Sequence, residues 1–299
     1  MIVDVHTFLW DSPEQLGTDA AARLRRRAPD PWTRPFGSVA VLEQMLAPGD
    51  CAIVLGFRSL MLEARIGHAQ IAAYVEQLAG KAVGFAGIDP YESDWRASLD
   101  DAVARHLQGV VVSPAAQGYR PDFGPAMELF EQCQARRLPV MVVGGLDLSP
   151  RAIMEYAQPM LLDVVARTFP QLRLIIGSMG DPFVEQTLAL LDRHEHALAD
   201  VAGLTTRPQQ LTQCLTQARD RGVIDRLLLG SGFPHHTPTD AARAIMQTRE
   251  LTRAAGVPLL PQDLLRNLVH RDALALLGIA APHPPAVAVP NTNTEGKTS

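Results

Sequence analysis

Cysteine is scarce in this sequence of 299 residues, and its spacing excludes the usual roles of clustered thiols. The three cysteines are Cys51, Cys133 and Cys214, with about 80 residues between each and the next. An odd number at such a wide spacing matches neither a disulfide framework nor a zinc-binding motif. We therefore expect three buried, reduced thiols in a cytoplasmic protein.

Long hydrophobic runs and an excess of positive charge are also missing. No uninterrupted apolar run approaches the roughly 20 residues that a membrane-spanning helix needs. The start, MIVDVH, lacks the basic segment that opens a signal peptide. The formal net charge is -5, so no general attraction to nucleic acid or anionic lipid is expected. These absences predict a cytoplasmic protein that binds neither nucleic acid nor membrane.

Short apolar runs are abundant, and most are continuous in Val, Ile and Leu. Such runs are typical of parallel strands that are buried on both faces of a sheet. No G-x-G-x-x-G motif follows the first run, which disfavours a dinucleotide-binding fold. The eight runs cover residues 1–6, 51–57, 82–89, 109–114, 139–145, 172–178, 197–203 and 226–232.

Segments with helical periodicity separate these runs. Strict alternation of strands and helices leaves two architectures, an eight-stranded barrel or an open doubly wound sheet. Eight units in about 275 residues favour the barrel. We predict a single α/β domain, a (β/α)8 TIM barrel over residues 1–280, followed by a disordered tail over 281–299 that is first Pro-rich and then polar. The helical segments are 64–78, 95–107, 123–137, 159–170, 183–194, 208–221 and 238–255.

Seven motifs follow one another along the chain at or near the predicted strand ends. They are DVHTFLW, GFAGIDP, GVVVSPAAQGYRPD, LPVMVVGG, LLDVVARTFPQLRLIIGSMG, ADVAG and RLLLGSGFPHHTP. In this order they resemble the amidohydrolase superfamily, and within it the amidohydrolase-related group that includes aminocarboxymuconate-semialdehyde decarboxylase. The resemblance spans roughly residues 1–280 and implies a TIM barrel whose chemistry lies at the carboxyl ends of the strands.

The same resemblance implies metal ligands that this sequence lacks. The family opens with D-x-H-x-H, whereas here Asp4 and His6 are followed by Phe8. Three further family positions, a histidine after strand five, a histidine after strand six and the aspartate of G-S-D-x-P-H, are occupied by Val143, Ser178 and Gly232.

A transition-metal site needs about three or four imidazole or carboxylate donors. Since Phe8, Val143 and Gly232 offer no donor and a serine hydroxyl is a poor ligand, we expect no metal and no other cofactor. Water activation by a metal would then be missing, as would the general base that the family aspartate supplies.

Several polar residues at the predicted strand ends remain as candidates. His6 is the candidate catalytic residue, because imidazole titrates near neutral pH. Arg58 or Arg120 could hold a carboxylate or phosphate by bidentate hydrogen bonds. The candidate ligand-binding residues are Arg58, Ser113, Tyr119, Arg120, Ser178 and His235.

Three functions stay open at this stage. The sequence favours a non-catalytic pseudoenzyme that binds a small molecule or a partner. The alternative is a metal-independent hydrolase, decarboxylase or lyase that acts on a small carboxylated substrate through His6, His235 or an arginine. The third is a structural subunit that pairs with an active relative. Whether the chain forms a homo-oligomer is also open.

Overall fold

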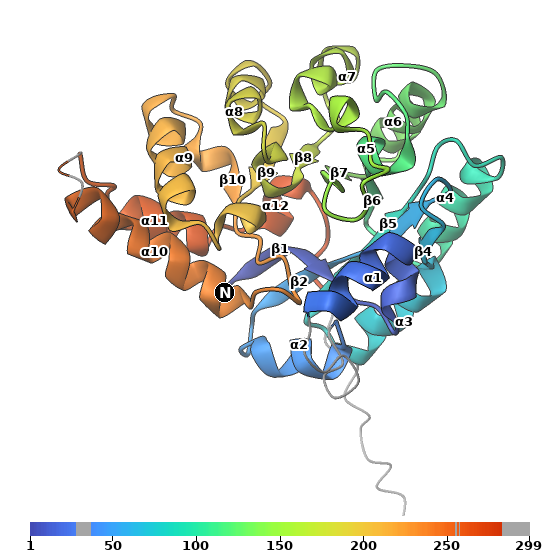
Figure 1. The fold of residues 1–299 in the computed structure, drawn as a ribbon, viewed down its shortest axis with the longest axis horizontal. Helices are drawn as coiled ribbons and strands as arrows, with labels where there is room; N and C mark the ends of the chain where they lie inside the picture. Colours follow the sequence, from blue (N-terminus) through green and yellow to red (C-terminus); the bar gives the residue numbers. More distant parts are fainter. Residues whose placement is uncertain (28–36, 255, 257, 283–299) are drawn as a thin grey trace, which may run out of the picture.

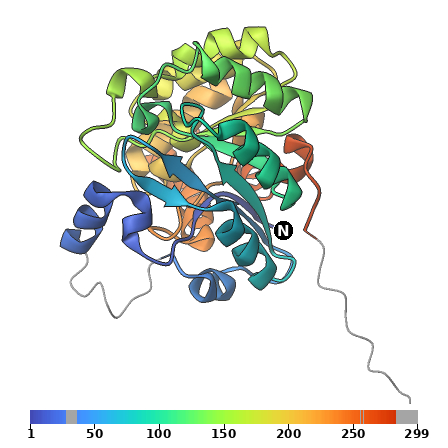
Figure 2. The same cartoon turned by 90° about the vertical axis from the view of Figure 1, so that its right-hand side faces the viewer.

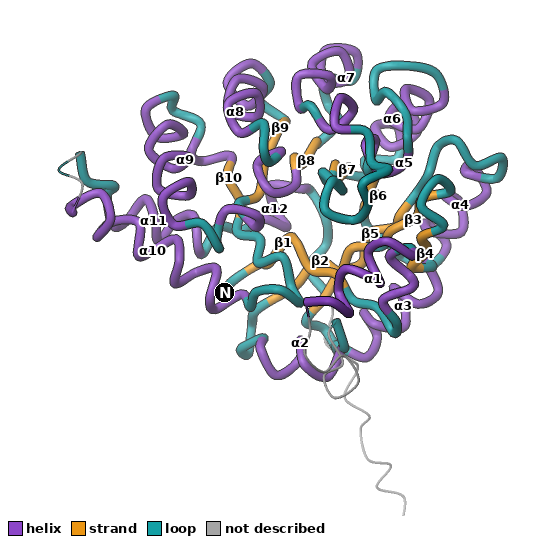
Figure 3. Tube along the Cα trace, viewed as in Figure 1, coloured by secondary structure: helices purple, strands orange, loops and turns teal. Residues whose placement is uncertain are grey.

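A computed structural model describes residues 1–27, 37–254, 256 and 258–282. Its centre is a sheet of eight strands in the order β1-β2-β5-β6-β7-β8-β9-β10, and every neighbouring pair is parallel. Figure 3 shows these strands in the middle of the molecule with the helices outside them. The strands are β1 (Val3–Phe8), β2 (Cys51–Leu55), β5 (Ala82–Gly87), β6 (Gly109–Val112), β7 (Val140–Val142), β8 (Leu174–Ile176), β9 (Ala197–Asp200) and β10 (Leu227–Leu228).

Backbone hydrogen bonds beyond β10 bring the last strand back to the first. Val5 N donates to Leu229 O at 3.0 Å, and Gly232 N donates to His6 O at 3.0 Å. Phe8 N donates to Phe233 O at 3.0 Å, beside the parallel bridge between Thr7 and Phe233. The sheet is therefore a nearly closed (β/α)8 barrel, and the predicted TIM-barrel fold is confirmed.

Helices cover the outside of the barrel (Figures 1 and 2). The α-helices are α1 (Thr18–Arg27), α2 (Val39–Met45), α3 (His68–Gln77), α4 (Trp95–Ala104), α5 (Pro114–Gln117), α6 (Pro125–Ala135), α7 (Leu162–Thr168), α8 (Val184–Arg193), α9 (Pro208–Asp220), α10 (Pro238–Ala254), α11 (Gln262–Val269) and α12 (Ala273–Leu277). The 3-10 helices are η1 (Pro13–Leu16), η2 (Met154–Ala157), η3 (Pro159–Leu161), η4 (Gly177–Gly180), η5 (Ala202–Leu204) and η6 (Ile224–Arg226). Within the described residues, no helix is both long and apolar enough to cross a membrane.

The strands are buried on both faces, as their continuous apolar sequences predict. All six residues of β5 and all five of β2 are buried between the barrel interior and the helix layer. The three cysteines are free and buried, as expected. Since α11 contacts β10 and α12 contacts β1, the last two helices cover the seam where the barrel closes.

One predicted helix starts later than its periodicity suggested. Residues 64–78 were expected to be helical, but Ala64–Ile66 is the strand β4, paired antiparallel with β3 (Phe57–Ser59). The helix α3 begins only at His68, after Gly67 in extended conformation. The hairpin partner lies directly after β2, so this pairing between neighbouring segments overrides the helical pattern. Most of the predicted disordered tail, residues 283–299, lies outside the described residues.

Candidate functional site at the carboxyl ends of the strands

His6 and Asp200 meet at the carboxyl ends of β1 and β9. His6 Nδ1 lies 3.0 Å from Asp200 Oδ2, and the His6 side chain is 10% exposed while that of Asp200 is fully buried. Because a carboxylate only accepts hydrogen bonds, Nδ1 is the donor and the imidazole is fixed in orientation. No hydrogen bond joins His6 Nε2 to another described residue. Nδ1 is therefore fixed by the scaffold, and Nε2 has no hydrogen-bond partner in the described part of the chain.

The remaining oxygen of Asp200 is also occupied. Asp200 Oδ1 accepts from Ser178 N at 3.1 Å and from Ala202 N at 2.8 Å. Gly230 makes this close packing possible, because a Cβ there would lie 2.7 Å from Asp200 Oδ1 and 2.9 Å from His6 Cβ. Asp200 thus joins β9 to the loops after β8 and β9 and orients His6.

Asp4 forms a second buried carboxyl cluster on the same strand as His6. Its Oδ1 accepts from Ser231 N at 2.8 Å and from His6 N at 3.2 Å. Its Oδ2 accepts from Ser231 Oγ at 2.5 Å and from Thr7 Oγ1 at 2.9 Å. These four hydrogen bonds link β1 to the segment after β10, so Asp4 stabilises the seam of the barrel.

Burial and charge act in opposite directions on His6. Burial alone disfavours the imidazolium, but the neighbouring Asp200 carboxylate, with smaller contributions from Asp4 and Asp147, raises the pKa of His6 above its usual value of 6.5. Burial raises the pKa of Asp4 above its usual value, and its hydrogen bonds with Ser231, His6 and Thr7 only partly offset this.

This set of side chains does not fit a transition-metal site. His6 Nδ1 donates to Asp200, which leaves Nε2 as the one ring nitrogen that could ligate a metal, and both oxygens of Asp4 and Asp200 accept hydrogen bonds from the scaffold. The ring of Phe8 packs edge-on against His6 at 5.6 Å between centroids. In the described part of the chain, no group of three or more His, Cys, Asp or Glu side chains is arranged to hold a metal ion.

Ser178 lies next to this pair in an uncommon backbone conformation. Ser178 (φ 52°) and Met179 (φ 55°) are consecutive left-handed residues in η4, directly after β8. Such φ values are rare outside glycine and mark a constrained turn. Ser178 is brought to the mouth through its backbone N–H to Asp200, while its half-buried side chain packs close to Gly203.

The two candidate arginines are paired with carboxylates of the protein, most of them from other loops. Arg58 on β3 contacts Glu92, and its guanidinium lies 3.6 Å from Asp94. Arg120 is exposed and pairs with Asp122 at 2.9 Å and Glu155 at 3.3 Å. Neither arginine contacts His6, so their predicted ligand-binding role stays a prediction.

The other candidates lie at different depths. Ser113 is fully buried at the end of β6 and Tyr119 is 3% exposed, and the Ser113 Oγ and Tyr119 hydroxyl have no hydrogen-bond partner among the described residues. The Tyr119 ring stacks on Tyr91 at 5.2 Å, and burial raises its pKa well above the usual value. His235 is exposed in the loop after β10, where its N–H donates to Gly232 O at 3.0 Å.

Asp147 was missed by the sequence reasoning. It is exposed on the turn after β7, where Leu148 N donates to Gly145 O at 3.1 Å, and its charge contributes to the raised pKa of His6. An aspartate two residues after a Gly-Gly pair has no motif to identify it. Only the folded chain brings its charge close enough to act on His6.

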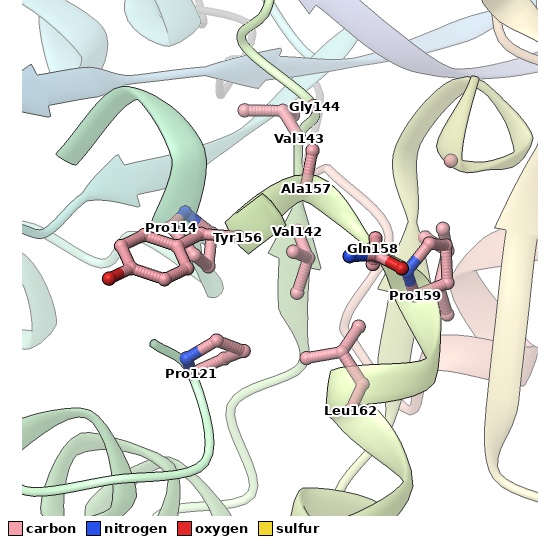
Figure 4. Close-up of a pocket in the computed structure, with 12 residues that line it drawn as sticks. Pro114, Pro121, Val142, Val143, Gly144, Tyr156, Ala157, Gln158, Pro159 and Leu162 are labelled. Atoms are coloured by element: carbon pink, nitrogen blue, oxygen red, sulfur yellow. The ribbon is translucent and has the colours of Figure 1, made fainter. Parts of the chain in front are cut away.

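Two hollows near these loops are not lined by His6 or Asp200. The first is a small apolar cavity behind β7 with space of about 10 Å³ for a water centre, enough for about one water. Figure 4 shows Val142 in this cavity with Tyr156 on one side and Pro159 on the other. The second is a groove of about 450 Å³ lined by residues of α8 and α9 and by Arg207 and Asp181. The hydrogen-bonded pair of His6 and Asp200 therefore lies outside both hollows.

Comparison with known proteins gives one family. A family model described as amidohydrolase matches residues 3–279. No curated protein matches the chain.

The solved structures that match share the fold at low sequence identity. An uncharacterised TIM-barrel protein from Bordetella bronchiseptica has a TM-score of 0.67 at 17% identity, over 93% of this chain and 99% of its own. A dihydroxybenzoic acid decarboxylase from Polaromonas sp. JS666, with bound manganese and the inhibitor 2-nitroresorcinol, has a TM-score of 0.63 at 16% identity, over 93% and 96%. A probable 2-pyrone-4,6-dicarboxylic acid hydrolase from Acinetobacter baumannii, with citric acid bound, has a TM-score of 0.61 at 14% identity, over 93% and 99%.

Proposed function

Because the chain belongs to the amidohydrolase family, we propose that it is a member that works without a metal ion and binds a small molecule at His6 without converting it. The observation that supports this is the use of the acidic side chains at the mouth. Asp4 and Asp200 spend all four carboxyl oxygens on hydrogen bonds within the scaffold. Asp4 accepts two hydrogen bonds on each oxygen, so it would have to release a buried donor to ligate a metal, at a cost of about 1–3 kcal/mol. Asp200 keeps one acceptor position, on Oδ2, but no group of three or more His, Cys, Asp or Glu side chains among the described residues is arranged to hold a metal with it.

A second candidate function rests on the orientation of His6. Nδ1 is held by a buried carboxylate while Nε2 has no partner among the described residues, an arrangement that suits general acid–base catalysis. On this alternative the protein is a metal-independent hydrolase, decarboxylase or lyase that acts on a small carboxylated substrate. In a decarboxylation, the imidazolium would donate the Nε2 proton to the carbon that loses carbon dioxide, and the electrons of the broken carbon–carbon bond would form the new C–H bond.

Metal dependence is tested by elemental analysis and thermal melting. We expect the purified protein to carry much less than one equivalent of zinc, manganese or iron, and added Zn²⁺ or Mn²⁺ to leave its melting temperature unchanged. Metal at about 1,000 times its Kd would stabilise the fold by about 4 kcal/mol, which melting would detect easily. A metal-dependent rise that disappears in His6→Asn would contradict the proposal.

Turnover separates the two candidates. Carboxylated rings are the first compounds to test, because dihydroxybenzoate decarboxylases are among the structural neighbours. We expect 2,6-dihydroxybenzoate to bind the chelator-treated protein without release of carbon dioxide. His6→Asn is the informative variant, because the asparagine amide can still donate to Asp200 but has no group in place of Nε2. Metal-free turnover that falls by about 10²–10⁴-fold in His6→Asn would favour the enzyme.

A further inference from the structure

The turn after β8 connects Arg207 to the pair of His6 and Asp200. Its residues Ser178 and Met179 have φ values of 52° and 55°, a left-handed conformation that residues other than glycine keep only where the surroundings hold it. Ser178 N donates to Asp200 Oδ1 at 3.1 Å, and the other oxygen of Asp200 accepts from His6 Nδ1 at 3.0 Å. Relaxation of this turn would therefore move a hydrogen-bond donor away from the carboxylate that orients His6.

Arg207, the residue before α9, holds the same turn through Asp181. Its guanidinium pairs with both carboxyl oxygens, with Nη1 3.1 Å from Oδ1 and Nη2 2.7 Å from Oδ2. Asp181 N in turn donates to Ser178 O at 3.1 Å, which closes the turn. The guanidinium also donates to Gly203 O, from Nε at 3.1 Å and from Nη2 at 2.8 Å. Arg207 thus ties the loop after β8 to the loop after β9.

Gly203 brings these two loops into direct contact. A Cβ at Gly203 would lie 2.9 Å from Ser178 Cβ, 3.1 Å from Ser178 Oγ and 3.7 Å from Arg207 Nη2. Ser178 therefore packs on this glycine beside the guanidinium. Every step from Arg207 to His6 is a hydrogen bond, an ion pair or a close packing contact.

We propose that Arg207 is a positioning residue for His6, which acts through the Ser178 turn and Asp200 to keep the proton of the neutral imidazole on Nδ1. This tautomer leaves a lone pair on Nε2, so neutral His6 offers a hydrogen-bond acceptor, or a base, to a bound molecule. The inference deepens the proposed function and rests on it, since it assumes that the ligand meets His6 at Nε2. It adds that the ligand presents a donor, such as a hydroxyl or an N–H group, to neutral His6.

Nitrogen NMR of the full chain tests the tautomer directly, because the chemical shifts of the two ring nitrogens show which one carries the proton. Arg207→Met keeps the apolar stem of the side chain and removes the guanidinium. We expect the ratio of the Nδ1–H form to the Nε2–H form of His6 to fall by about tenfold. This factor converts to about 1.4 kcal/mol, close to the contribution of one hydrogen bond to a charged group.

The titration of His6 separates positioning from a simple effect of charge. Loss of a cation without any movement would favour the imidazolium and raise the pH at which His6 titrates. Loss of the contact with Asp200 would lower this pH, because Asp200 contributes most among the charges that raise the pKa of His6. We expect Arg207→Met to lower it.

Arg221→Met is the matched control. Arg221 follows the same helix and pairs with Glu185 at 3.0 Å, with a side chain that is 39% exposed against 36% for Arg207. It should leave the tautomer and the titration of His6 unchanged. Gly203→Ala disturbs the connection independently, because its Cβ would press on Ser178, and it should shift the proton in the same direction as Arg207→Met. Thermal melting verifies that each variant is folded, and Gly203→Ala decides the test if Arg207→Met is not.

The outcomes that overturn the inference are distinct from those that overturn the proposed function. A wild-type protein whose neutral His6 carries its proton on Nε2 overturns the inference. A folded Arg207→Met or Gly203→Ala protein with the wild-type tautomer ratio does so too, as does a rise in the titration pH of Arg207→Met or an equal change in Arg221→Met. None of these measurements needs a ligand. Failure of 2,6-dihydroxybenzoate to bind would count against the proposed function and would leave the NMR result as it stands.

Discussion

The two halves of the barrel mouth differ in whether their buried polar side chains have hydrogen-bond partners. In the half formed by β1, β9 and β10, every carboxyl oxygen of Asp4 and Asp200 accepts a hydrogen bond. In the half formed by β6 and β7, the buried hydroxyls of Ser113 and Tyr119 have no partner among the described residues. The carboxylates around His6 are therefore fully hydrogen-bonded, whereas in the other half Gln117 is satisfied by Ser113 N, Arg58 O and Ile88 O but the two hydroxyls beside it are not. The difference indicates that the first half is built to hold His6 and close the barrel.

The largest effect on stability is expected from removing the Asp4 carboxylate, which lies in the half of the mouth formed by β1, β9 and β10. Asp4→Ala leaves two buried N–H groups and two hydroxyls without their acceptor, so we expect the free energy of unfolding to fall by about 3–5 kcal/mol. Asp4→Asn is the control and should lose about half as much, because its Oδ1 still accepts from His6 N and Ser231 N. Urea denaturation measures both. A loss below about 1 kcal/mol in Asp4→Ala would mean that this half is not stabilised as described.

A smaller effect is expected from pH. The pKa of His6 is raised in the folded state above 6.5, because burial lowers it but the charge and hydrogen bond of Asp200, together with the charges of Asp4 and Asp147, raise it by more. A raised pKa gives stability that is fully present below about pH 6.5 and is lost as the pH rises through the folded-state pKa. The urea midpoint should therefore decline above this pH in the wild type.

His6→Asn should remove that part of the decline. His196→Asn, which changes a half-exposed histidine on the opposite face, should retain it. If the urea midpoint of His6→Asn declined with pH as steeply as that of the wild type, Asp200 would not raise the pKa of His6 on folding.

The smallest effect on stability is expected in the half of the mouth formed by β6 and β7. Ser113→Ala removes a buried hydroxyl that has no partner, so the free energy of unfolding should stay within about 0.5 kcal/mol or rise slightly. Ser231→Ala is the same chemical change in the half formed by β1, β9 and β10. There the hydroxyl donates to Asp4 and accepts from Phe233 N at 3.0 Å, and its loss should cost about 1–3 kcal/mol. If Ser113→Ala lowered the free energy of unfolding more than Ser231→Ala does, the difference described between the two halves would be wrong.

Much of the fold could be predicted, because the strands are local features. The eight continuous apolar runs all became barrel strands, since burial on both faces leaves a direct mark on the sequence. The β3–β4 hairpin was missed because residues 64–66 also fit a helical period, and only the pairing of Arg58 with Arg65 decides between the two.

The site could be predicted only in part. His6 and Ser178 were identified at strand ends, and the structure brings both to Asp200. The sequence could not show that Arg58 and Arg120 are occupied by carboxylates, because Glu92 and Glu155 lie 34 and 35 residues further along the chain (92 − 58 and 155 − 120).

The sequence alone determined the barrel and the residues at its strand ends, because continuous apolar runs and the helical segments between them are properties of neighbouring residues. Tertiary structure alone decided which nitrogen of His6 is hydrogen-bonded to Asp200, since the two residues are 194 positions apart in the sequence. It also decided that the charge of Asp147, on the turn after β7, acts on His6. Hydrogen bonds and ion pairs depend on a few ångströms of separation between side chains, and the closure of the barrel sets those separations.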